Sequence, residues 1–429
     1  MIDYPTVERA VRAADPEALP EAVRAVLLTM GVGDVEVHLA DYALRVLTPL
    51  TDTRQQAGTL PIHASVEGKA FASQQPQLRR QADGSTLVTV PVTVRGDRHG
   101  TLTACLPAGG EPDGHDSDSD GLDGDDLAGD GPGSIADSAR STDGAGISDS
   151  ADSAATEVET LQAVARLLGH EIVVAERNTD RYQQARRASR LTLAAETQWQ
   201  LLPGRSSRRR EYALGAQLEP AYAIRGDSYD WSATGTDLTL AVVNGMGEGT
   251  AAALLTSLAV NALRNARRAG LALADQAVLA DQAVYTQHRG DMYVSALLLC
   301  FAYDTGLVTV VDAGSPQIWL RRGRSVERVS VDPQLPLGMF EETAYRPQTF
   351  QVLPGDRLVI VSDGAHAARS PAGELYGDAG LQRGIASSGL LPAEDVPTAI
   401  LREVASHRSA DADDDVVVVC VDWYGRSGG

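Results

Sequence analysis

The sequence predicts an α+β protein in which antiparallel sheets are flanked by helices. Three features of the C-terminal half support this prediction: strand patterns recur from residue 211 onward, the turns between them are short, and helical patterns are confined to 250–288 and 378–408. A repeated βαβ fold would instead alternate strands with helices. Upstream, residues 1–108 predict a separate small α/β unit.

The composition is that of a soluble protein with more than one domain. Its 429 residues exceed the usual length of a single domain, and 43% of them are hydrophobic. No apolar run approaches the ~20 residues that a membrane-spanning helix needs, and the N-terminus lacks the pattern of a secretory signal. Cys105, Cys300 and Cys420 are too few and too far apart for a disulfide framework. We therefore expect a cytoplasmic protein with no membrane partner.

The formal net charge of −21 comes largely from one segment. Residues 110–155 contain 13 acidic residues and one arginine, and they are rich in glycine and serine. Such a composition cannot bury enough apolar surface to fold, so we predict a disordered linker over 109–156. The rest of the chain is only mildly acidic and has no basic patch, so we expect no nucleic-acid partner.

The N-terminal part combines helix and strand patterns. Two amphipathic helix patterns, "TVERAVRAA" and "LPEAVRAVLLTM", precede strands and a hairpin that turns at Gly96-Asp97. The segment "VPVTVRGDRHGTLTA" resembles the last two strands of GAF-type sensor domains, which implies a GAF-like sensor over 1–108. Residues 157–204 predict one long connecting helix, or two in tandem, and we expect any homodimer to form through it.

A glycine-rich turn links a strand to a helix in "AVVNGMGEGTAAALL", and three interpretations compete: a phosphate cradle, a metal site or a turn without a ligand. A nucleotide-binding phosphate loop needs a lysine after its last glycine, whereas Glu248 precedes Gly249 here and Thr250 follows it. A dinucleotide site needs a parallel βαβ unit, which the strand pattern does not support. The choice between a metal site and a bare turn depends on the rest of the chain.

Several predicted strands end in an acidic residue followed by a turn. Asp227 occurs in "IRGDSYDW", Asp363 in "VIVSDGAHAA", and Asp413, Asp414 and Asp415 precede "VVVVCVDW". Acids at strand ends can converge at one sheet edge, where facing carboxylates need cations to offset their repulsion. Against this, Asp-Gly is a common turn sequence and acidic runs are usually solvated. Taken together, the acids favour a metal site.

From residue 197 to its end, the chain resembles the bacterial metal-dependent protein phosphatases of the PPM type, which include the sporulation regulator stage II E. The motifs occur in the family's order: "TQWQLLP", "GDSYD", "NGMGEG", "DAGSP", "LPLGMF", "LPGDRLVIVSDG" and "DDDVVVV". The resemblance implies a phosphatase domain over 205–426, built as a β-sandwich of two antiparallel sheets between helical layers. It also implies two Mn²⁺ or Mg²⁺ ions that activate a water molecule, so that no covalent enzyme intermediate is needed.

The resemblance also assigns roles by position. It makes Asp227, Asp363 and Asp414 the catalytic metal ligands, with the carbonyl oxygen of Gly245 as a further ligand. It places Asp230 and Asp415 nearby, where they would hold metal-bound waters. The implied substrate is a phosphorylated regulatory protein of the anti-sigma-factor antagonist type.

Two positions depart from the family pattern. Asn244 stands where the family has a metal-bridging aspartate, and Ser315 where it has a histidine. Asparagine keeps an oxygen donor but no charge, and a unit charge about 4 Å from another is worth ~4 kcal/mol at an effective dielectric constant near 20. We therefore expect weaker metal binding, with fewer than two ions as an alternative. Glu248 could supply the missing carboxylate or could complement the dipole of the following helix.

Two functions therefore remain open. The chain is an active serine/threonine phosphatase, or it is an impaired relative that acts as a signal-responsive binding module in partner switching. Both depend on the same acidic cluster, and they differ in whether Asn244 still permits metal-dependent hydrolysis.

Overall fold

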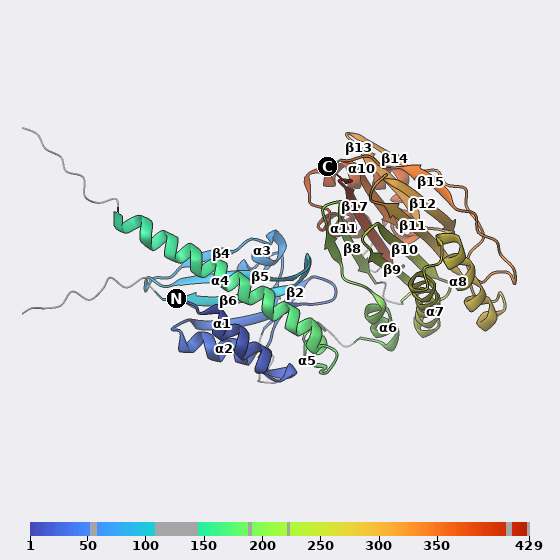
Figure 1. Ribbon diagram of the computed structural model, residues 1–429. Coiled ribbons are helices and arrows are strands. Elements are labelled where there is room, and N and C mark those ends of the chain that lie inside the picture. Colours follow the sequence, from blue (N-terminus) through green and yellow to red (C-terminus); the bar gives the residue numbers. More distant parts are fainter. Residues whose placement is uncertain (52–57, 108–144, 188–190, 221–223, 409–413, 427–429) are drawn as a thin grey trace, which may run out of the picture. The chain divides into compact units, whose positions relative to one another are not determined.

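The computed structural model describes residues 1–51, 58–107, 145–187, 191–220, 224–408 and 414–426. These residues form two compact units (Figure 1). One comprises Met1–Val94 and His99–Arg186, and the other Arg95–Arg98 and Arg187–Gly429. In the described part of the chain, no helix combines the length and the apolar character that crossing a bilayer requires.

The first unit is built on a six-stranded sheet with the strand order β3-β2-β1-β6-β5-β4. Its strands are β1 (Gly33–Ala40), β2 (Val46–Pro49), β3 (Leu60–Pro61), β4 (Gln77–Arg80), β5 (Thr86–Val94) and β6 (Asp97–Leu106). Its helices are α1 (Tyr4–Ala13), the short η1 (Pro16–Ala18), α2 (Leu19–Thr29), α3 (Val66–Ser73), α4 (Ala145–Ala175) and α5 (Arg181–Ala185).

The two faces of this sheet are covered differently. Helices α1, α2, α4 and α5 share the main core with apolar side chains of β1, β5 and β6. On the opposite face, α3 packs through Phe71 against a smaller cluster that contains Ala40 and Leu47. A small α/β unit was predicted for this part of the chain, and its resemblance to a GAF domain stays a prediction.

The helix pattern of residues 157–204 forms three separate helices. The first, α4, begins at Ala145, inside the stretch predicted as linker, and ends at Ala175. Its side chains Leu161, Val164 and Leu168 are buried in the core of the first unit, so α4 is a structural part of that unit. The second unit begins with a separate helix, α6 (Leu193–Leu201). Most of the predicted acidic linker lies outside the described residues.

The second unit contains two antiparallel sheets. The five-stranded sheet has the order β15-β12-β11-β10-β9, and the six-stranded sheet β14-β13-β16-β17-β8-β7. The strands are β7 (Ser206–Arg208), β8 (Tyr212–Glu219), β9 (Asp227–Ala233), β10 (Asp237–Gly245), β11 (Val294–Ala302), β12 (Leu307–Ala313), β13 (Gln317–Arg322), β14 (Ser325–Arg328), β15 (Gln348–Gln351), β16 (Arg357–Val361) and β17 (Val416–Trp423).

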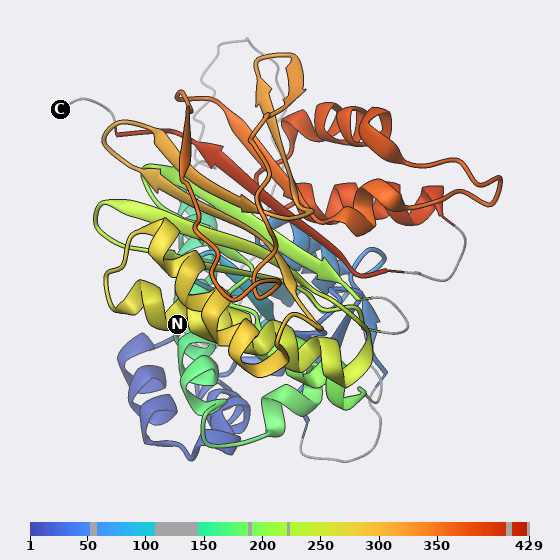
Figure 2. The ribbon, with the colours of Figure 1, turned by 90° about the vertical axis from the view of Figure 1, so that its right-hand side faces the viewer.

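These two sheets face each other between helical layers. One apolar core joins their inner faces. Helices α7 (Gly249–Arg268) and α8 (Leu273–His288) cover the five-stranded sheet, while α10 (Gly377–Ser387) and α11 (Val396–His407) cover the six-stranded one (Figure 2). The short α9 (Asp363–Ala367) and η2 (Ser388–Leu390) complete the unit. This arrangement confirms the predicted antiparallel sandwich flanked by helices.

The central strands are almost wholly apolar because both faces of each sheet are covered. In β17, "VVVVCVDW", every residue except Asp422 is buried, because one face meets the other sheet and the other face meets helices. Strands with one solvated face would alternate apolar and polar residues. Polar side chains are therefore concentrated at the strand ends, where the candidate site lies.

Candidate functional site

The start of β9 and the end of β10 meet at one edge of the five-stranded sheet. Because these strands are antiparallel, Asp227, the first residue of β9, pairs with Asn244 near the end of β10. Both side chains lie on the face that carries Tyr229 and Val242, which is the inner face of the sandwich. The sequence placed Asp227 at the end of a strand, and the structure corrects this, since Asp227 begins one.

A second group of acids lies at an edge of the six-stranded sheet. Asp363 begins α9 just after β16, and Asp414 and Asp415 directly precede β17, the antiparallel neighbour of β16. The side-chain nitrogen Nδ2 of Asn244 donates a 2.8 Å hydrogen bond to Oδ1 of Asp363 and so joins the two sheets. The structure therefore brings the predicted acids together, although Asp413 lies outside the described residues.

The Asp227 carboxylate is fully buried, and neither of its oxygens has a hydrogen-bond partner among the described residues. Burial raises the pKa of Asp227 well above its usual range. The Ser362 hydroxyl opposes this rise from close by, without the geometry of a hydrogen bond, and the negative charges of Asp415, Asp363 and Asp414 add to it. A buried carboxylate in this state is costly unless a proton or a cation accompanies it.

Asp414 is in a similar environment. Burial raises the pKa of Asp414 to about 6, the charges of Asp363 and Asp415 contribute in the same direction, and Arg225 opposes them. Its Oδ1 accepts a 2.9 Å hydrogen bond from the main-chain N–H of Asp415. Mutual repulsion of this kind is what a bound cation would relieve.

The side chains in this arrangement nevertheless do not form a complete metal-binding site. Within the described ranges, no three histidine, cysteine or acidic side chains converge closely enough to hold a metal ion. One cause is visible in the contacts, because Asn244 presents its amide nitrogen, and not its oxygen, to Asp363. The hydrogen bond occupies a carboxylate oxygen that a cation would otherwise need. Rotation of the Asn244 amide would exchange its nitrogen for its oxygen at this place.

Asp415 organises the neighbouring backbone. It is fully buried, and its Oδ2 accepts hydrogen bonds from the main-chain nitrogens of Arg225 and Gly226, at 2.9 and 3.1 Å. A third bond, of 2.7 Å, comes from Nε2 of Gln198 on α6. The same nitrogen donates a 2.8 Å bond to the main-chain oxygen of Asp227. Gln198 thus ties α6 to the start of β9 and to the acid before β17.

The sequence did not identify this function of Gln198. Its position in the "TQWQLLP" motif indicated a family feature, but nothing local indicated that its amide would bond to residues 29 and 217 positions away. Two glycines show a similar long-range constraint. A Cβ atom on Gly226 would lie 2.6 Å from the carbonyl oxygen of Gly245, and one on Gly245 would lie 2.3 Å from Oγ1 of Thr256. Both positions therefore exclude any larger residue.

Asp230 is not part of the cluster. It lies three residues after Asp227 in β9 and therefore on the opposite face of the strand. Its carboxylate is paired with Arg264 at 2.8 Å and Arg267 at 2.7 Å, both on α7. The expectation that Asp230 holds metal-bound waters is wrong, because its side chain is directed to the helical layer and both of its oxygens are engaged there.

The structure also places Glu248 and Ser315. Glu248 is the exposed N-cap residue of α7, and it makes no capping hydrogen bond with its side chain. Ser315 follows β12, and its hydroxyl is buried without a hydrogen-bond partner among the described residues. Glu248 therefore lies in solvent as the structure stands, while Ser315 presents a small unpaired polar group where the family pattern has an imidazole.

Comparison with known proteins finds a family model that matches part of the second unit. Residues 234–424, which include Asn244, Asp363 and Asp414, match the family model "Stage II sporulation protein E (SpoIIE)". A search of curated proteins finds no match.

Solved structures with a similar fold include the PP2C phosphatase domain of SpoIIE from Bacillus subtilis, with a fragment of its regulatory domain. It is 21% identical over 52% of this chain and 66% of that one, with a TM-score of 0.46. The RsbU and RsbW domains of a Mycobacterium tuberculosis protein are 22% identical over 51% of this chain and 61% of theirs, also with a TM-score of 0.46.

A third similar structure is RsbX in complex with magnesium, which is 14% identical over 51% of this chain and 98% of that one, with a TM-score of 0.40. The chain thus spans less than two thirds of the first two of these proteins. Residues 234–424 thus match the stage II sporulation protein E family model, and the second unit has the fold expected from the PPM-type resemblance, two antiparallel sheets between helical layers.

Proposed function

We propose that the second unit is a metal-dependent phosphatase that hydrolyses phosphoserine or phosphothreonine on a regulatory protein. The observation that carries this proposal is the Asp227 carboxylate, which is buried, has no hydrogen-bond partner among the described residues, and is surrounded by three further acids. A protein that only needed a stable sandwich would gain nothing from such a group.

The chemistry of these donors suits divalent cations, although the acidic side chains would have to move closer together to hold one. Asp227, Asp363 and Asp414 offer anionic oxygens, and Asn244, the residue paired with Asp227, offers a neutral oxygen once its amide rotates. The main-chain oxygen of the next residue, Gly245, is the further ligand that the family resemblance implies. Oxygen donors of this kind suit Mg²⁺ and Mn²⁺. When bound, such a cation supplies an acidified water molecule and positive charge against the phosphoryl group.

The remaining polar groups have positioning roles in this proposal. Asp415 fixes the backbone of Arg225 and Gly226, which leads directly into Asp227. Gln198 holds the main-chain oxygen of Asp227 from α6. These bonds keep the Asp227 carboxylate in one place, so that little reorganisation is needed when a ligand binds.

The substrate class follows from the family resemblance. A phosphorylated regulatory protein of the anti-sigma-factor antagonist type is the proposed substrate, and a signal from the first unit is proposed to control the site. Dimerisation and the cytoplasmic location stay predictions. No nucleic-acid partner is proposed, because the sequence carries an excess of acidic residues.

Hydrolysis of p-nitrophenyl phosphate by the full-length chain tests the activity. We expect Mn²⁺-dependent turnover that EDTA abolishes and that Asp227→Ala reduces by about 100-fold or more, as expected for loss of a metal ligand. Asp275→Ala, which removes an exposed acid on α8, is the matched control and should leave turnover unchanged. Turnover that is equal in Asp227→Ala and in the natural chain would refute the assignment.

A second candidate is an impaired phosphatase that serves as a binding module. It is favoured by the hydrogen bond from Asn244 to Asp363, which connects these two residues directly, without a cation between them. Asn244→Asp decides between the two. If the site is impaired, this variant should bind Mn²⁺ at least about tenfold more tightly in calorimetry, because it restores a charge near the other acids. It should also gain hydrolysis.

The same variant should be less stable than the natural chain in EDTA, because a hydrogen bond is replaced by repulsion from Asp363. Asn261→Asp, which adds the same charge on the exposed side of α7, is its control. If Mn²⁺ affinity and hydrolysis do not change in Asn244→Asp, the natural site is not limited by its asparagine, and the impaired-enzyme alternative fails.

A further inference from the structure

The loop between β14 and β15 extends the five-stranded sheet at the edge where the candidate site lies. Strand β12 ends at Ala313 and stops short of Val294, the first residue of β11. Leu337 of the loop takes this place, and the main-chain nitrogens of Val294 and Leu337 each donate to the oxygen of the other, at 2.9 and 2.8 Å. On its other side, Val294 pairs with Gly245, the residue after Asn244. The loop thus lies two strand spacings, about 10 Å, from the end of β10.

Helix α8 holds this loop in place. Asp281 of α8 is fully buried, and its Oδ1 accepts a 2.7 Å hydrogen bond from the main-chain nitrogen of Gly338 and a 3.1 Å bond from the hydroxyl of Tyr345. Gly338 packs so closely on α8 that a Cβ atom there would lie 2.2 Å from Cγ1 of Val284. Residues 338–345 are therefore anchored at both ends without a ligand, which lowers the cost of ordering them when a partner binds.

Three apolar side chains near the acid cluster form a surface that we call the rim: Met246, Met292 and Phe340. Met246 is 43% exposed and Phe340 is 52% exposed, while Met292 is half-buried. The main-chain nitrogen of Met246 donates a 3.0 Å hydrogen bond to the main-chain oxygen of Tyr293. A Cβ atom on Gly247 would lie 3.4 Å from Cε of Met292. The turn after β10 and the segment before β11 are therefore direct neighbours.

Phe340 joins the rim from the other side of the segment before β11. A Cβ atom on Gly290 would lie 2.9 Å from the main-chain oxygen of Met339, the residue before Phe340. Methionine and aromatic side chains are enriched in protein interfaces, because they bury a large area and methionine adapts its shape to the partner. The rim begins two residues after Asn244, so it lies within reach of a protein chain that brings a phosphoryl group to the acid cluster.

Acidic side chains surround the rim. The three segments that carry it are residues 244–249, 289–294 and 335–342. They contain four acids, all exposed, which are Glu248, Asp291, Glu341 and Glu342. The same segments contain one arginine, Arg289. Within the described ranges, none of the four carboxylates takes part in an ion pair. The surroundings of the rim therefore carry an excess of negative charge.

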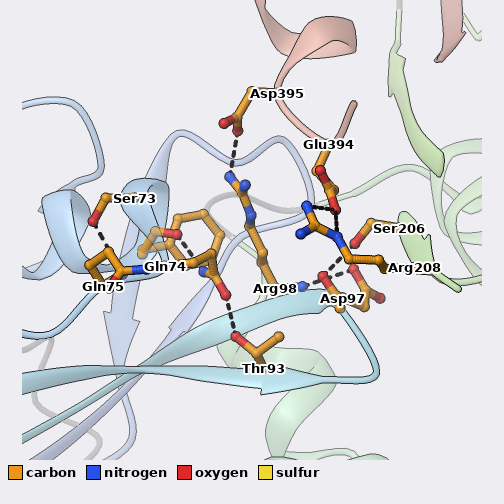
Figure 3. A network of polar contacts seen from close by, with 12 residues as sticks. Ser73, Gln74, Gln75, Thr93, Asp97, Arg98, Ser206, Arg208, Glu394 and Asp395 are labelled. Carbon is orange, nitrogen blue, oxygen red and sulfur yellow. Dashed lines mark hydrogen bonds and ion pairs between the residues drawn. The ribbon is translucent and has the colours of Figure 1, made fainter. Parts of the chain in front are cut away.

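Two other acids of the second unit show the contrast. Oε1 of Glu394 lies 2.8 Å from Nη2 of Arg208 (Figure 3), and Oε1 of Glu219 lies 2.8 Å from Nη2 of Arg408. The acids around the rim have no such compensation, so they attract a basic segment and repel an acidic one. The charge of this surface therefore complements a partner that presents lysine or arginine beside an apolar side chain.

We propose that the rim binds the part of a phosphorylated protein that flanks its phosphoserine or phosphothreonine, and that it selects an apolar and a basic side chain there. The rim spans about 10 Å, which an extended peptide covers in about three residues. Both selected side chains therefore lie within about three residues of the phosphorylated one. This inference rests on the proposed function, because it names the feature by which the same site recognises its substrate.

Phosphopeptide hydrolysis by the full-length chain in Mn²⁺ tests this selectivity. The parent peptide has a leucine and an arginine close to its phosphoserine. Serine replaces the leucine in a second peptide, and glutamate replaces the arginine in a third. We expect kcat/KM for the parent to exceed that for the second by about fivefold or more and that for the third by about tenfold or more. Added salt should reduce the difference between the parent and the third, because exposed charges are screened.

Two variants locate the selectivity. Phe340→Ser should reduce the preference for leucine over serine to less than about twofold, because it removes apolar area from the rim. Glu341→Lys should at least halve the preference for arginine over glutamate. Leu390→Ser and Glu374→Lys, which change an exposed leucine and an exposed glutamate of the same unit, are the matched controls and should leave both preferences unchanged. Each preference is a ratio measured on one variant, so a general loss of activity cancels.

The outcomes separate this proposal from the phosphatase assignment. Equal kcat/KM for all three peptides would overturn the proposal for the rim and leave the phosphatase assignment intact. The phosphatase assignment fails if neither p-nitrophenyl phosphate nor any peptide is hydrolysed in Mn²⁺. In that case calorimetry with the unphosphorylated peptides decides, because it needs no turnover. Tighter binding of the parent than of the other two supports the rim as a docking surface, and equal binding or no binding overturns it.

Discussion

Asp227 and Asp230 lie on the same strand, three residues apart, and both are almost completely buried, at 0% and 2% exposure. Their environments differ in one respect. Asp230 faces α7 and is paired with two arginines, whereas Asp227 faces the sandwich edge and has no hydrogen-bond partner among the described residues. The comparison shows that burial of an acid does not by itself mark a functional site. What marks it is burial without internal compensation.

The largest effect that this comparison predicts is on stability. Asp230→Ala leaves the half-buried Arg264 and Arg267 without their partner, so we expect the free energy of unfolding to fall by about 3 kcal/mol. Asp227→Ala, measured in EDTA, removes a buried carboxyl group that has no hydrogen-bond partner among the described residues, and it should cost less than about 1 kcal/mol or stabilise the chain. Urea unfolding at pH 7 measures both. Equal losses of stability in the two variants would contradict the proposed difference between the two faces of β9.

Strand β9 shows the limit of what could be predicted from the sequence. The apolar runs that became β10, β11 and β17 were predicted because strands covered on both faces consist of nearly continuous Val, Leu and Ala. The segment "DSYDWSA" of β9 mixes polar and aromatic residues, so it carries no apolar run that predicts a strand. Alternation along a strand would have separated Asp227 from Asp230, but only after that segment had been identified as a strand.

Other parts of the site could not be predicted in this way. The partners of Asp230 lie 34 and 37 residues away on α7, and the bond from Asn244 reaches 119 residues to Asp363. Such contacts depend on the register of the sheets and on helix packing, which leave no local pattern in the sequence. The family motifs predicted the order of the acids along the chain, whereas the register of the sheets determines which of them lie close together. Neither predicts which side-chain atom of Asn244 faces Asp363.

A smaller effect is expected at the link between α6 and the acids. Gln198→Ala removes the amide that joins the main-chain oxygen of Asp227 to the Asp415 carboxylate, and it leaves two buried acceptors with fewer partners. We expect a loss of about 1–3 kcal/mol in the free energy of unfolding and weaker Mn²⁺ binding. Gln200→Ala removes an exposed amide of the same helix and is the control. If both variants lose the same stability, α6 does not support Asp227 through this bond.

The smallest effect concerns Glu248, which differs from both buried acids because water already solvates its carboxylate. Glu248→Ala should change the free energy of unfolding by no more than about 0.5 kcal/mol, as for an ordinary surface position. Mn²⁺ affinity, followed by calorimetry, should also stay the same. A clear drop in affinity would mean that the N-terminal turn of α7 rearranges to bring this carboxylate to Asp227. In that case an exposed acid, and not only the buried ones, would provide the charge that Asn244 lacks.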